Sequence, residues 1–284
     1  MTVTIDLHLH TTASDGRCTP QELATRAFAA GIRVMSVTDH DTRAGEPAAR
    51  ATAEALGMTF ISGIEITSVH AGKDVHVLAY GLPATVPALD AVLTSQRQSR
   101  VERAREIGER LARLNVPIDV DALVASAASA SGKAIARPQI AERLVAAGHV
   151  SSVAEAFDRY LDERSPAYVP HRGASPAEIV SLVTTCGGVA SVAHPGQLKK
   201  DELIGELVDA GLPCLEAYHS SHDMEAQRHY LDLAGRFRLA VTGGSDFHGD
   251  GTRRAEFFGV VGLPPAEFER FKAVLAQATA SQGA

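Results

Sequence analysis

The sequence lacks the features of a secreted, disulfide-bonded or membrane-spanning protein. Its three cysteines, Cys18, Cys186 and Cys214, form no CxxC pair and no even disulfide set, which is typical of a reducing compartment. No apolar stretch approaches the length of a membrane span. The opening MTVTIDLHLH has neither the basic start nor the long apolar run of a signal peptide. We therefore expect a cytoplasmic protein without a membrane partner.

An excess of basic residues is also missing. The net charge of -7 and the pI near 5.9 argue against a protein that binds long nucleic acid through its overall field. An anionic substrate must then be attracted by a local group of cations. With 284 residues, 45% of them hydrophobic, the chain is long enough for one large α/β barrel or for two modest domains.

Short β-branched runs alternate with helical patterns along the chain. Segments such as PQELATRAFAAG and GEPAARATAEALG carry apolar residues at helical spacing and end in Gly, as a parallel βα repeat requires. The economical interpretation is an α/β barrel built from βα units. Seven strands are predicted, in the runs TVTIDLHLH, RVMSVTDH, MTFISGIEIT, DVHVLAYGL, GVASVAHP, CLEAYHS and RLAVTGGSDFH.

The βα alternation is interrupted between about residues 93 and 168, where several helical segments follow one another without a strand. We expect an inserted small helical subdomain at 93–168, with the barrel formed by 1–92 and 169–284. The many arginines of the first inserted helix, SQRQSRVERAREIGERLARLN, are expected to form a solvated face.

Histidines and carboxylates recur at or near the ends of the predicted strands. A lone buried histidine is usually a hydrogen-bonded core residue, but many such groups on one rim would be costly to bury unpaired. The carboxyl ends of strands in a parallel barrel meet at one mouth, so these donors predict a metal site. They exceed what one tetrahedral ion needs, which favours two or three ions. The candidates are His8, His10, Asp15, His40, Glu65, His76, His194, Asp246 and His248.

The segments that carry these residues resemble the motifs of the PHP (polymerase and histidinol phosphatase) family. They are DLHLHTTASDG, SVTDHDT, GIEIT, VASVAHP and GGSDFHG. The resemblance implies a distorted (β/α)7 TIM-like barrel and a metal-dependent phosphoesterase, in which a metal-activated water attacks phosphorus. The helical insertion and ARPQIAERL resemble the stand-alone members that act on nucleoside 3',5'-bisphosphates and short oligoribonucleotides, which implies a small phosphorylated nucleotide as substrate.

The resemblance also implies a ligand set for each ion. A first ion is assigned to His8, His10, Glu65 and Asp246, and a second to Glu65, His76 and His194. A third is assigned to Asp15, His40 and His248. Because many relatives have a histidine where this chain has Asp15, an oxygen ligand there favours Mn²⁺ or Mg²⁺. Manganese is preferred, and Zn²⁺ and Fe stay open. Asp39 is a candidate to orient an imidazole by accepting its other N–H, or is a plain turn residue.

Substrate contacts are expected outside the metal ligands. Arg137 resembles the position from which the insertion reaches the substrate phosphate, and a planar guanidinium suits that target. Arg172 is a second candidate for binding phosphate. His171 and His222 are weaker candidates for phosphate contact or leaving-group protonation. His219 is given no role and is interpreted as a surface residue.

Other functions remain open at this point. The site could belong to a histidinol-phosphate-type or general phosphatase. An amidohydrolase is less favoured, because such enzymes commonly carry a metal-bridging Lys at a strand end, whereas Lys199 and Lys200 follow His194 in a loop or early helix. A non-catalytic PHP module should have lost ligands, yet every expected position is filled.

Overall fold

The strands of the protein lie in two sheets. The computed structural model describes residues 3–129, 135, 137–252 and 254–280. Within these ranges a parallel sheet has the order β1 (Ile5–Asp6), β2 (Val34–Ser36), β3 (Thr59–Ile61). A five-stranded sheet has the order β4 (Gly63–His70), β5 (Lys73–Tyr80), β6 (Val189–Val192), β7 (Cys214–His219), β8 (Ala240–Gly244). The chain is therefore an α/β protein.

Backbone hydrogen bonds join the two sheets at both sides. After β1, the Leu7 N–H donates to the Gly243 carbonyl at 3.1 Å, so the first strand continues beside β8. On the other side, His40 and Glu65 form a parallel bridge between the segment after β2 and strand β4. Only Ser62 separates β3 from β4. The ends of the strands that carry the candidate ligands are thereby brought to one place.

Strand β5 departs from the expected parallel order. It runs antiparallel to both β4 and β6, because a turn at Ala71 and Gly72, both with positive φ, joins β4 directly to β5 and leaves no room for a helix. Glu65 consequently lies near the start of β4, not at a strand end as the sequence suggested. Thr67 pairs with His76, which puts Glu65 and His76 on the same face of the antiparallel pair.

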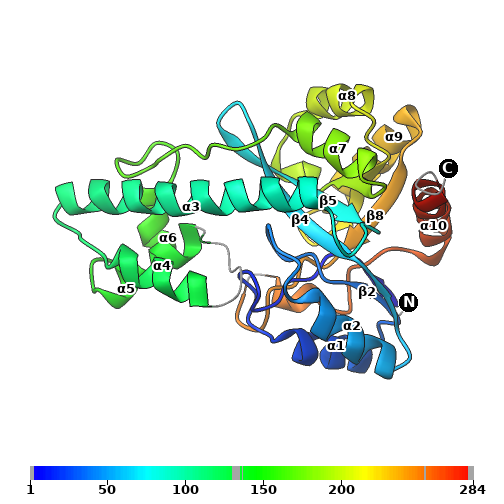
Figure 1. The fold of residues 1–284 in the computed structure, drawn as a ribbon, viewed down its shortest axis with the longest axis horizontal. Coiled ribbons are helices and arrows are strands. Elements are labelled where there is room, and N and C mark those ends of the chain that lie inside the picture. The colour runs from blue at the N-terminus through cyan, green and yellow to red at the C-terminus, as the bar shows by residue number, and fades with distance from the viewer. Residues whose placement is uncertain (1–2, 130–134, 136, 253, 281–284) are drawn as a thin grey trace.

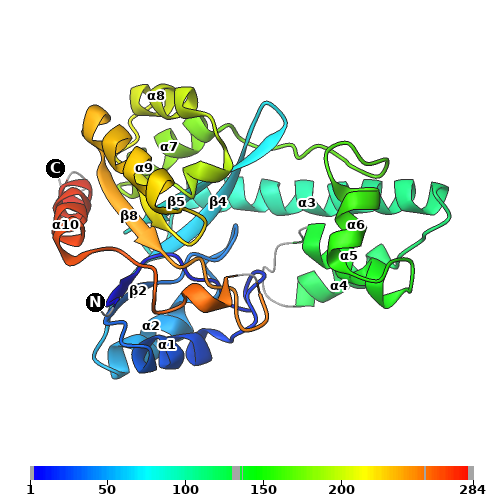
Figure 2. The same cartoon turned by 180° about the vertical axis from the view of Figure 1, so that it is seen from behind.

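Helices cover the outside of both sheets (Figures 1 and 2). The two helices predicted from PQELATRAFAAG and GEPAARATAEALG are confirmed, and they pack together beside the first sheet as α1 (Pro20–Ala29) and α2 (Glu46–Ala55). Thr19 and Ser175 each begin a helix with a capping box that uses a Glu three residues on. The second sheet carries α7 (Pro176–Thr185), α8 (Asp201–Asp209), α9 (Met224–Phe237) and α10 (Pro265–Ala280), with short η2 (Pro195–Gln197) and η3 (Ala255–Phe257) between them.

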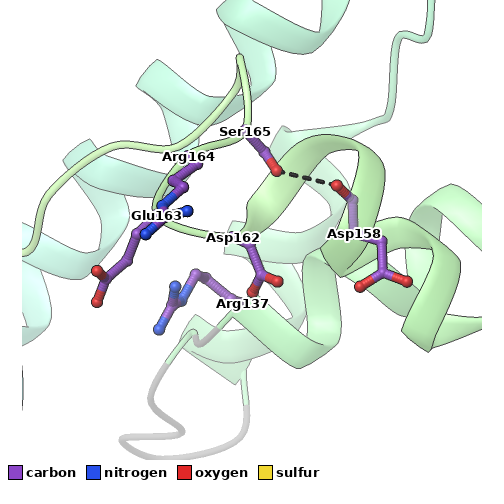
Figure 3. A pocket seen from close by; sticks show the side chains of 6 residues that line it. All are labelled: Arg137, Asp158, Asp162, Glu163, Arg164 and Ser165. Carbon is purple, nitrogen blue, oxygen red and sulfur yellow. Dashed lines mark hydrogen bonds between the residues drawn. The ribbon is translucent and has the colours of Figure 1, made fainter.

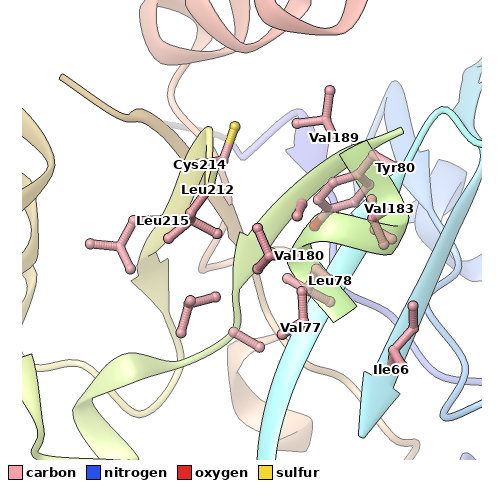
Figure 4. Packing of buried hydrophobic residues seen from close by; sticks show 14 of the residues in the cluster. Ile66, Val77, Leu78, Tyr80, Val180, Val183, Val189, Leu212, Cys214 and Leu215 are labelled. Atoms are coloured by element: carbon pink, nitrogen blue, oxygen red, sulfur yellow. The ribbon is translucent and has the colours of Figure 1, made fainter. Parts of the chain in front are cut away.

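The main hydrophobic core lies between the five-stranded sheet and its helices (Figure 4). Val77 and Leu78 of β5 pack there with Val180 and Val183 of α7. Tyr80 is fully buried, and its hydroxyl donates to the Leu7 carbonyl at 2.9 Å. This bond ties β5 to the extension of β1 across the interior, and a buried phenol is expected to have such a partner.

The long helix α3 (Pro87–Arg113) follows β5. Leu89 and Leu93, in its first turns, belong to the main core, whereas Ile107 and Leu111 belong to a second cluster. That cluster also draws on α4 (Val120–Ser129), α5 (Arg137–Ala146), α6 (Val153–Ala156) and η1 (Phe157–Leu161). Figure 1 shows α3 projecting from the sheets with α4, α5 and α6 along its far part. Within the described ranges, no helix combines the length and apolar character needed to cross a membrane.

Candidate metal centre

Glu65 lies at the middle of a ring of histidines. Its Oε2 atom is 3.2 Å from His8 Nε2, 3.2 Å from His10 Nε2 and 3.3 Å from His40 Nδ1. Its Oε1 atom is 2.8 Å from His76 Nδ1 and 3.0 Å from His194 Nε2. A carboxylate that faces imidazoles through both oxygens has the geometry of a bridging ligand.

Asp246 and Asp15 extend this cluster on the side of His10. Asp246 Oδ1 lies 3.2 Å from His10 Nε2 and 3.3 Å from His248 Nδ1. Asp15 Oδ1 lies 3.3 Å from His248 Nε2, and Asp15 Oδ2 is 3.9 Å from His40 Nε2. All nine residues that the sequence proposed as ligands are therefore gathered in one contiguous cluster.

Two of these residues have backbone conformations that L-amino acids seldom adopt. His194 follows β6 with φ of 30°, and Asp246 follows β8 with φ of 54°, both in the left-handed region. Such conformations cost free energy and persist where the surroundings impose them. Here they turn the two side chains toward Glu65 and His10 just past the ends of their strands.

The protonation states suit cation binding. Burial alone would raise the pKa of Glu65, but the facing histidines hold it well below its ordinary value. Burial lowers the pKa of His40 and of His194 to about 3. For His8 burial acts in the same direction, but Glu216 and Glu65 outweigh it and raise the pKa to about 10. Ionised carboxylates and neutral imidazoles are the forms that bind metals, so an ion would displace the extra proton of His8.

The donor set fits divalent cations. Several buried ligand atoms have no hydrogen-bond partner in the described structure, among them both ring nitrogens of His10, Nδ1 of His194 and Oδ1 of Asp246. Unsatisfied buried polar atoms are costly unless a ligand occupies them. Ligand atoms lie within 4.8 Å of one another in four groups of the predicted residues: His8–His10–Asp246, His8–Glu65–His194, His40–Glu65–His76 and His10–Asp15–His40–His248.

Comparison with known proteins identifies the family of this chain. Residues 6–161 match the PHP domain family. The chain belongs to the PHP family. A 3',5'-nucleoside bisphosphate phosphatase of Chromobacterium violaceum is 33% identical over 266 residues, which cover 92% of this chain and 93% of the relative. A 5'-3' exoribonuclease of Haemophilus influenzae is 34% identical over 253 residues, with 87% and 91% covered.

Solved structures agree with this assignment. A Bifidobacterium adolescentis protein, described as a candidate metal-dependent phosphoesterase, superposes with a TM-score of 0.85 at 31% identity and covers 95% of both chains. The family resemblance read from the motifs is confirmed, as is the predicted enzyme class, a phosphoric ester hydrolase. The metal dependence implied by the family agrees with the His, Asp and Glu groups of this PHP protein.

A pocket of about 160 Å³ opens beside the metal centre. It is lined by the proposed ligands Asp15, His40 and His76, by Ser14, Asp74 and Pro138, and by Arg100, Arg103 and Arg137. Arg137 also lines a second hollow, of about 550 Å³, together with Asp158, Asp162, Glu163, Arg164 and Ser165 (Figure 3). Arg137 therefore lines a pocket that also contains three of the proposed metal ligands, and its contact with a substrate phosphate stays a prediction.

The sequence predicted that the arginines of α3 form a solvated face, but not all of them are exposed. Arg100 is buried and pairs with Asp41, with its Nη2 2.6 Å from Oδ2, and it also donates to the Thr67 hydroxyl. Arg103 lines the pocket, and its Nε donates to the Val169 carbonyl at 2.8 Å. Arg103 was overlooked because helical periodicity cannot tell a charged side chain that faces a pocket from one that faces solvent.

Asp39 does not accept a hydrogen bond from an imidazole in the described structure. One carboxylate oxygen accepts from the Thr11 N–H and the Ser14 hydroxyl, each at 2.7 Å, and the other accepts from the Thr11 hydroxyl at 2.7 Å. The loop that Asp39 holds in this way leads directly to Asp15. Its effect on the metal centre therefore passes through a loop, not through a histidine ring.

The remaining substrate candidates lie differently from the expectation. His171 is buried, and its Nδ1 is 3.0 Å from Oδ1 of Asp74, so Asp74 and not His171 lines the pocket. Arg172 is exposed and does not line the pocket. His222 accepts the Gly196 N–H at Nε2, and its Nδ1 donates to the Ala217 carbonyl. Both ring nitrogens of His222 therefore form hydrogen bonds to backbone groups, which leaves neither to contact a phosphate.

Three side chains that contact the cluster were missed from the sequence. Glu216 lies 2.9 Å from His8 Nδ1, and His219 lies 3.1 Å from Asp246 Oδ2. Arg254 donates to the same Asp246 oxygen. A glutamate within the predicted strand CLEAYH, beside apolar residues, was the available signal, since Glu is seldom fully buried without a partner. His219 is buried and is not the surface residue that was expected.

Proposed function

We propose that this PHP protein hydrolyses a phosphate ester of a small nucleotide, either a nucleoside 3',5'-bisphosphate or the terminal phosphate and adjacent diester of a short oligoribonucleotide. The observation that carries the proposal is the position of Arg103 and Arg137 in a small pocket beside the histidine-ringed Glu65. The relatives named as a nucleoside bisphosphate phosphatase and an exoribonuclease support this substrate class.

The proposed ligands divide among two or three divalent ions. His8, His10, Glu65 and Asp246 would hold one ion, Glu65 with His76 and His194 a second, and Asp15 with His40 and His248 a third. When bound, such ions supply an activated water and neutralise charge on the phosphoryl oxygens. Mn²⁺ is the proposed metal, because the aspartate at position 15 adds an oxygen to a mixed nitrogen and oxygen set.

The pocket residues would recognise a second phosphate. Arg100 is already neutralised by Asp41, whereas Arg103 and Arg137 form no ion pair among the described residues, so their charges are available to an anion. Guanidinium groups suit a phosphate because they donate in a planar fork. Holding one phosphate there would orient the other at the metal centre. Arg172, which is exposed, takes no part in this proposal, and we replace it with Arg103.

The two sheets also support a proposal for the overall fold. We propose that they act as one distorted seven-stranded barrel in which β3 and β4 form a single bent strand. The residues 93–168 remain our proposed helical subdomain, with 1–92 and 169–284 as the barrel, and α3 begins six residues before that boundary, at Pro87. A cytoplasmic location also remains a proposal, consistent with the absence of a disulfide among the three cysteines.

The proposal is tested with a panel of phosphate esters at fixed Mn²⁺. The panel compares adenosine 3',5'-bisphosphate with adenosine 5'-monophosphate, adenosine 3'-monophosphate, histidinol phosphate and a dinucleotide carrying a 5'-phosphate. We expect kcat/KM for the bisphosphate to exceed that for either monophosphate by at least about tenfold, which corresponds to roughly 1.4 kcal/mol of transition-state stabilisation. Equal efficiencies would indicate a general phosphatase, and a preference for histidinol phosphate would refute the nucleotide assignment.

A further inference from the structure

Strand β7 is the strand of the five-stranded sheet to which no metal ligand has been assigned. It lies between β6 and β8, whose ends carry His194 and Asp246. Two of its side chains, Glu216 and His219, are buried, with 0% and 2% of their surface exposed. Neither pairs with a lysine or arginine within the described structure. Burying a carboxylate and an imidazole costs free energy unless specific partners compensate for the lost hydration.

Glu216 contacts two of the proposed metal ligands at once. Its Oε1 is 2.9 Å from His8 Nδ1, and its Oε2 accepts the backbone N–H of His194 at 2.7 Å. The oxygen that faces the His194 N–H must be an acceptor, as the oxygens of a carboxylate are. A carboxylate can only accept, which makes His8 Nδ1 the donor and leaves Nε2 of that ring directed at Glu65.

The same carboxylate supports an unusual backbone. His194 has φ of 30°, and its N–H would be a buried donor without a partner if Glu216 did not accept from it. Glu216 therefore fixes the ring of one ligand and the main chain of another.

His219 orients the carboxylate of a third proposed ligand, Asp246. Its Nδ1 accepts the backbone N–H of Ser221 at 3.0 Å, and a backbone N–H can only donate. The proton of the neutral ring must then be on Nε2, which donates to Asp246 Oδ2 at 3.1 Å. Arg254 donates to the same oxygen. Oδ1 of Asp246 is left without a hydrogen-bond partner and faces His10 and His248.

We propose that β7 is a positioning strand. Its Glu216 and His219 set the tautomer, carboxylate rotation and backbone of the metal ligands that follow β1, β6 and β8. The proposal rests on the metal centre described under the proposed function. The ligand atoms of His8, Glu216 and His219 also lie within 4.8 Å of one another, so a further ion there is the rival interpretation. The hydrogen bonds oppose it, because one oxygen of Glu216 and one nitrogen of His219 already accept backbone N–H groups. Both oxygens of Glu65, by contrast, face histidine rings.

The test measures metal binding without turnover. Metal-stripped wild type, Glu216→Gln, His219→Leu and His219→Gln are titrated with Mn²⁺ by calorimetry, and free Mn²⁺ is followed by electron paramagnetic resonance. Loss of a positioning contact of this kind lowers metal affinity by about 10–100-fold. We expect that loss for Glu216→Gln and His219→Leu, with the number of ions at saturation unchanged. His219→Gln, whose amide can donate to Asp246, should recover part of the affinity.

A surface variant and a folding check separate loss of a positioning contact from misfolding. His229→Leu is the matched control, because His229 lies on α9, is half exposed and pairs with Asp201 away from the proposed metal ligands. This variant should bind Mn²⁺ as wild type does. Thermal unfolding in EDTA checks that each variant folds, and Glu216→Gln, which keeps the side-chain volume, carries the test if His219→Leu does not fold. Wild-type affinity in a folded Glu216→Gln, or the loss of one ion at saturation, would overturn the positioning role. A wild type that binds no Mn²⁺ would instead refute the proposed function.

Discussion

Arg103 and Arg137 approach the same aromatic ring from two different helices. The guanidinium carbon of Arg103, on α3, lies 5.9 Å from the centre of the Tyr168 ring, and that of Arg137, at the start of α5, lies 5.6 Å from it. Burial lowers the pKa of Arg103, and the charge of Arg137 acts in the same direction. Two like charges that line the same pocket attract an anion more strongly than either would alone, which supports the proposed site for a second phosphate.

Truncating either arginine should weaken recognition of the second phosphate while leaving the metals in place. We expect Arg103→Ala and Arg137→Ala each to lower kcat/KM for adenosine 3',5'-bisphosphate by at least about tenfold, with a much smaller effect on adenosine 5'-monophosphate. Arg105→Ala is the matched control, since Arg105 lies on the same helix, is 55% exposed and is 3.9 Å from its acidic neighbour Asp121. Equal losses for both substrates in steady-state assays would rule out a second-phosphate site.

The contact between Asp39 and the loop before Asp15 leaves no room for a side chain at Gly45, which precedes α2. A Cβ atom there would lie 2.6 Å from Asp39 Oδ2 and 2.8 Å from Thr11 Oγ1, so Gly45→Ala must displace the contacts through which Asp39 holds the loop. We expect Mn²⁺ affinity and kcat to fall by roughly 10-fold or more, as for other outer contacts of metal sites. Gly235→Ala is the control, because its Cβ would meet nothing within 4 Å. Unchanged activity in Gly45→Ala would show that the loop does not depend on Asp39.

Removal of metal should lower the stability of the protein. Glu65 and Asp246 are buried and Asp15 is partly buried, and each belongs to a group of candidate ligand atoms that lie within 4.8 Å of one another. Ligands that bind only the folded state add free energy of unfolding by mass action. One Mn²⁺ site at 100 times its Kd would contribute about 2.7 kcal/mol. Thermal unfolding should therefore occur several degrees higher with Mn²⁺ than with EDTA. Identical Tm values in the two conditions would argue against a metal centre.

The sequence predicted those parts of the site that lie close to strand ends. His8 and His10 alternate along one extended segment, so their shared face follows from strand geometry alone. Asp246 and His248 were predicted from their place just after β8, although the left-handed backbone that turns Asp246 inward was not. The seven predicted strand runs all contain strands of the structure, with MTFISGIEIT holding both β3 and β4.

Other parts depended on tertiary contacts that local patterns do not encode. Nothing in DVHVLAYGL distinguishes an antiparallel strand from a parallel one; the short turn before it decides the direction. The role of Asp39 could not be read from its neighbour His40, because its partners are Thr11 and Ser14, 28 and 25 positions away. Glu216 stands 208 positions from the ring that it orients.

If Glu65 joins the ions of a catalytic metal centre, its removal must affect metal binding and turnover together. Bound metal and phosphate release from adenosine 3',5'-bisphosphate are measured together in Glu65→Gln, which removes an anionic ligand at nearly constant volume. Glu54→Gln is the control, at a glutamate whose side chain is 58% exposed. We expect a folded Glu65→Gln protein with less bound metal and no turnover, while Glu54→Gln matches wild type. Full phosphate release by Glu65→Gln, with metal content unchanged, would show that Glu65 does not join catalytic ions.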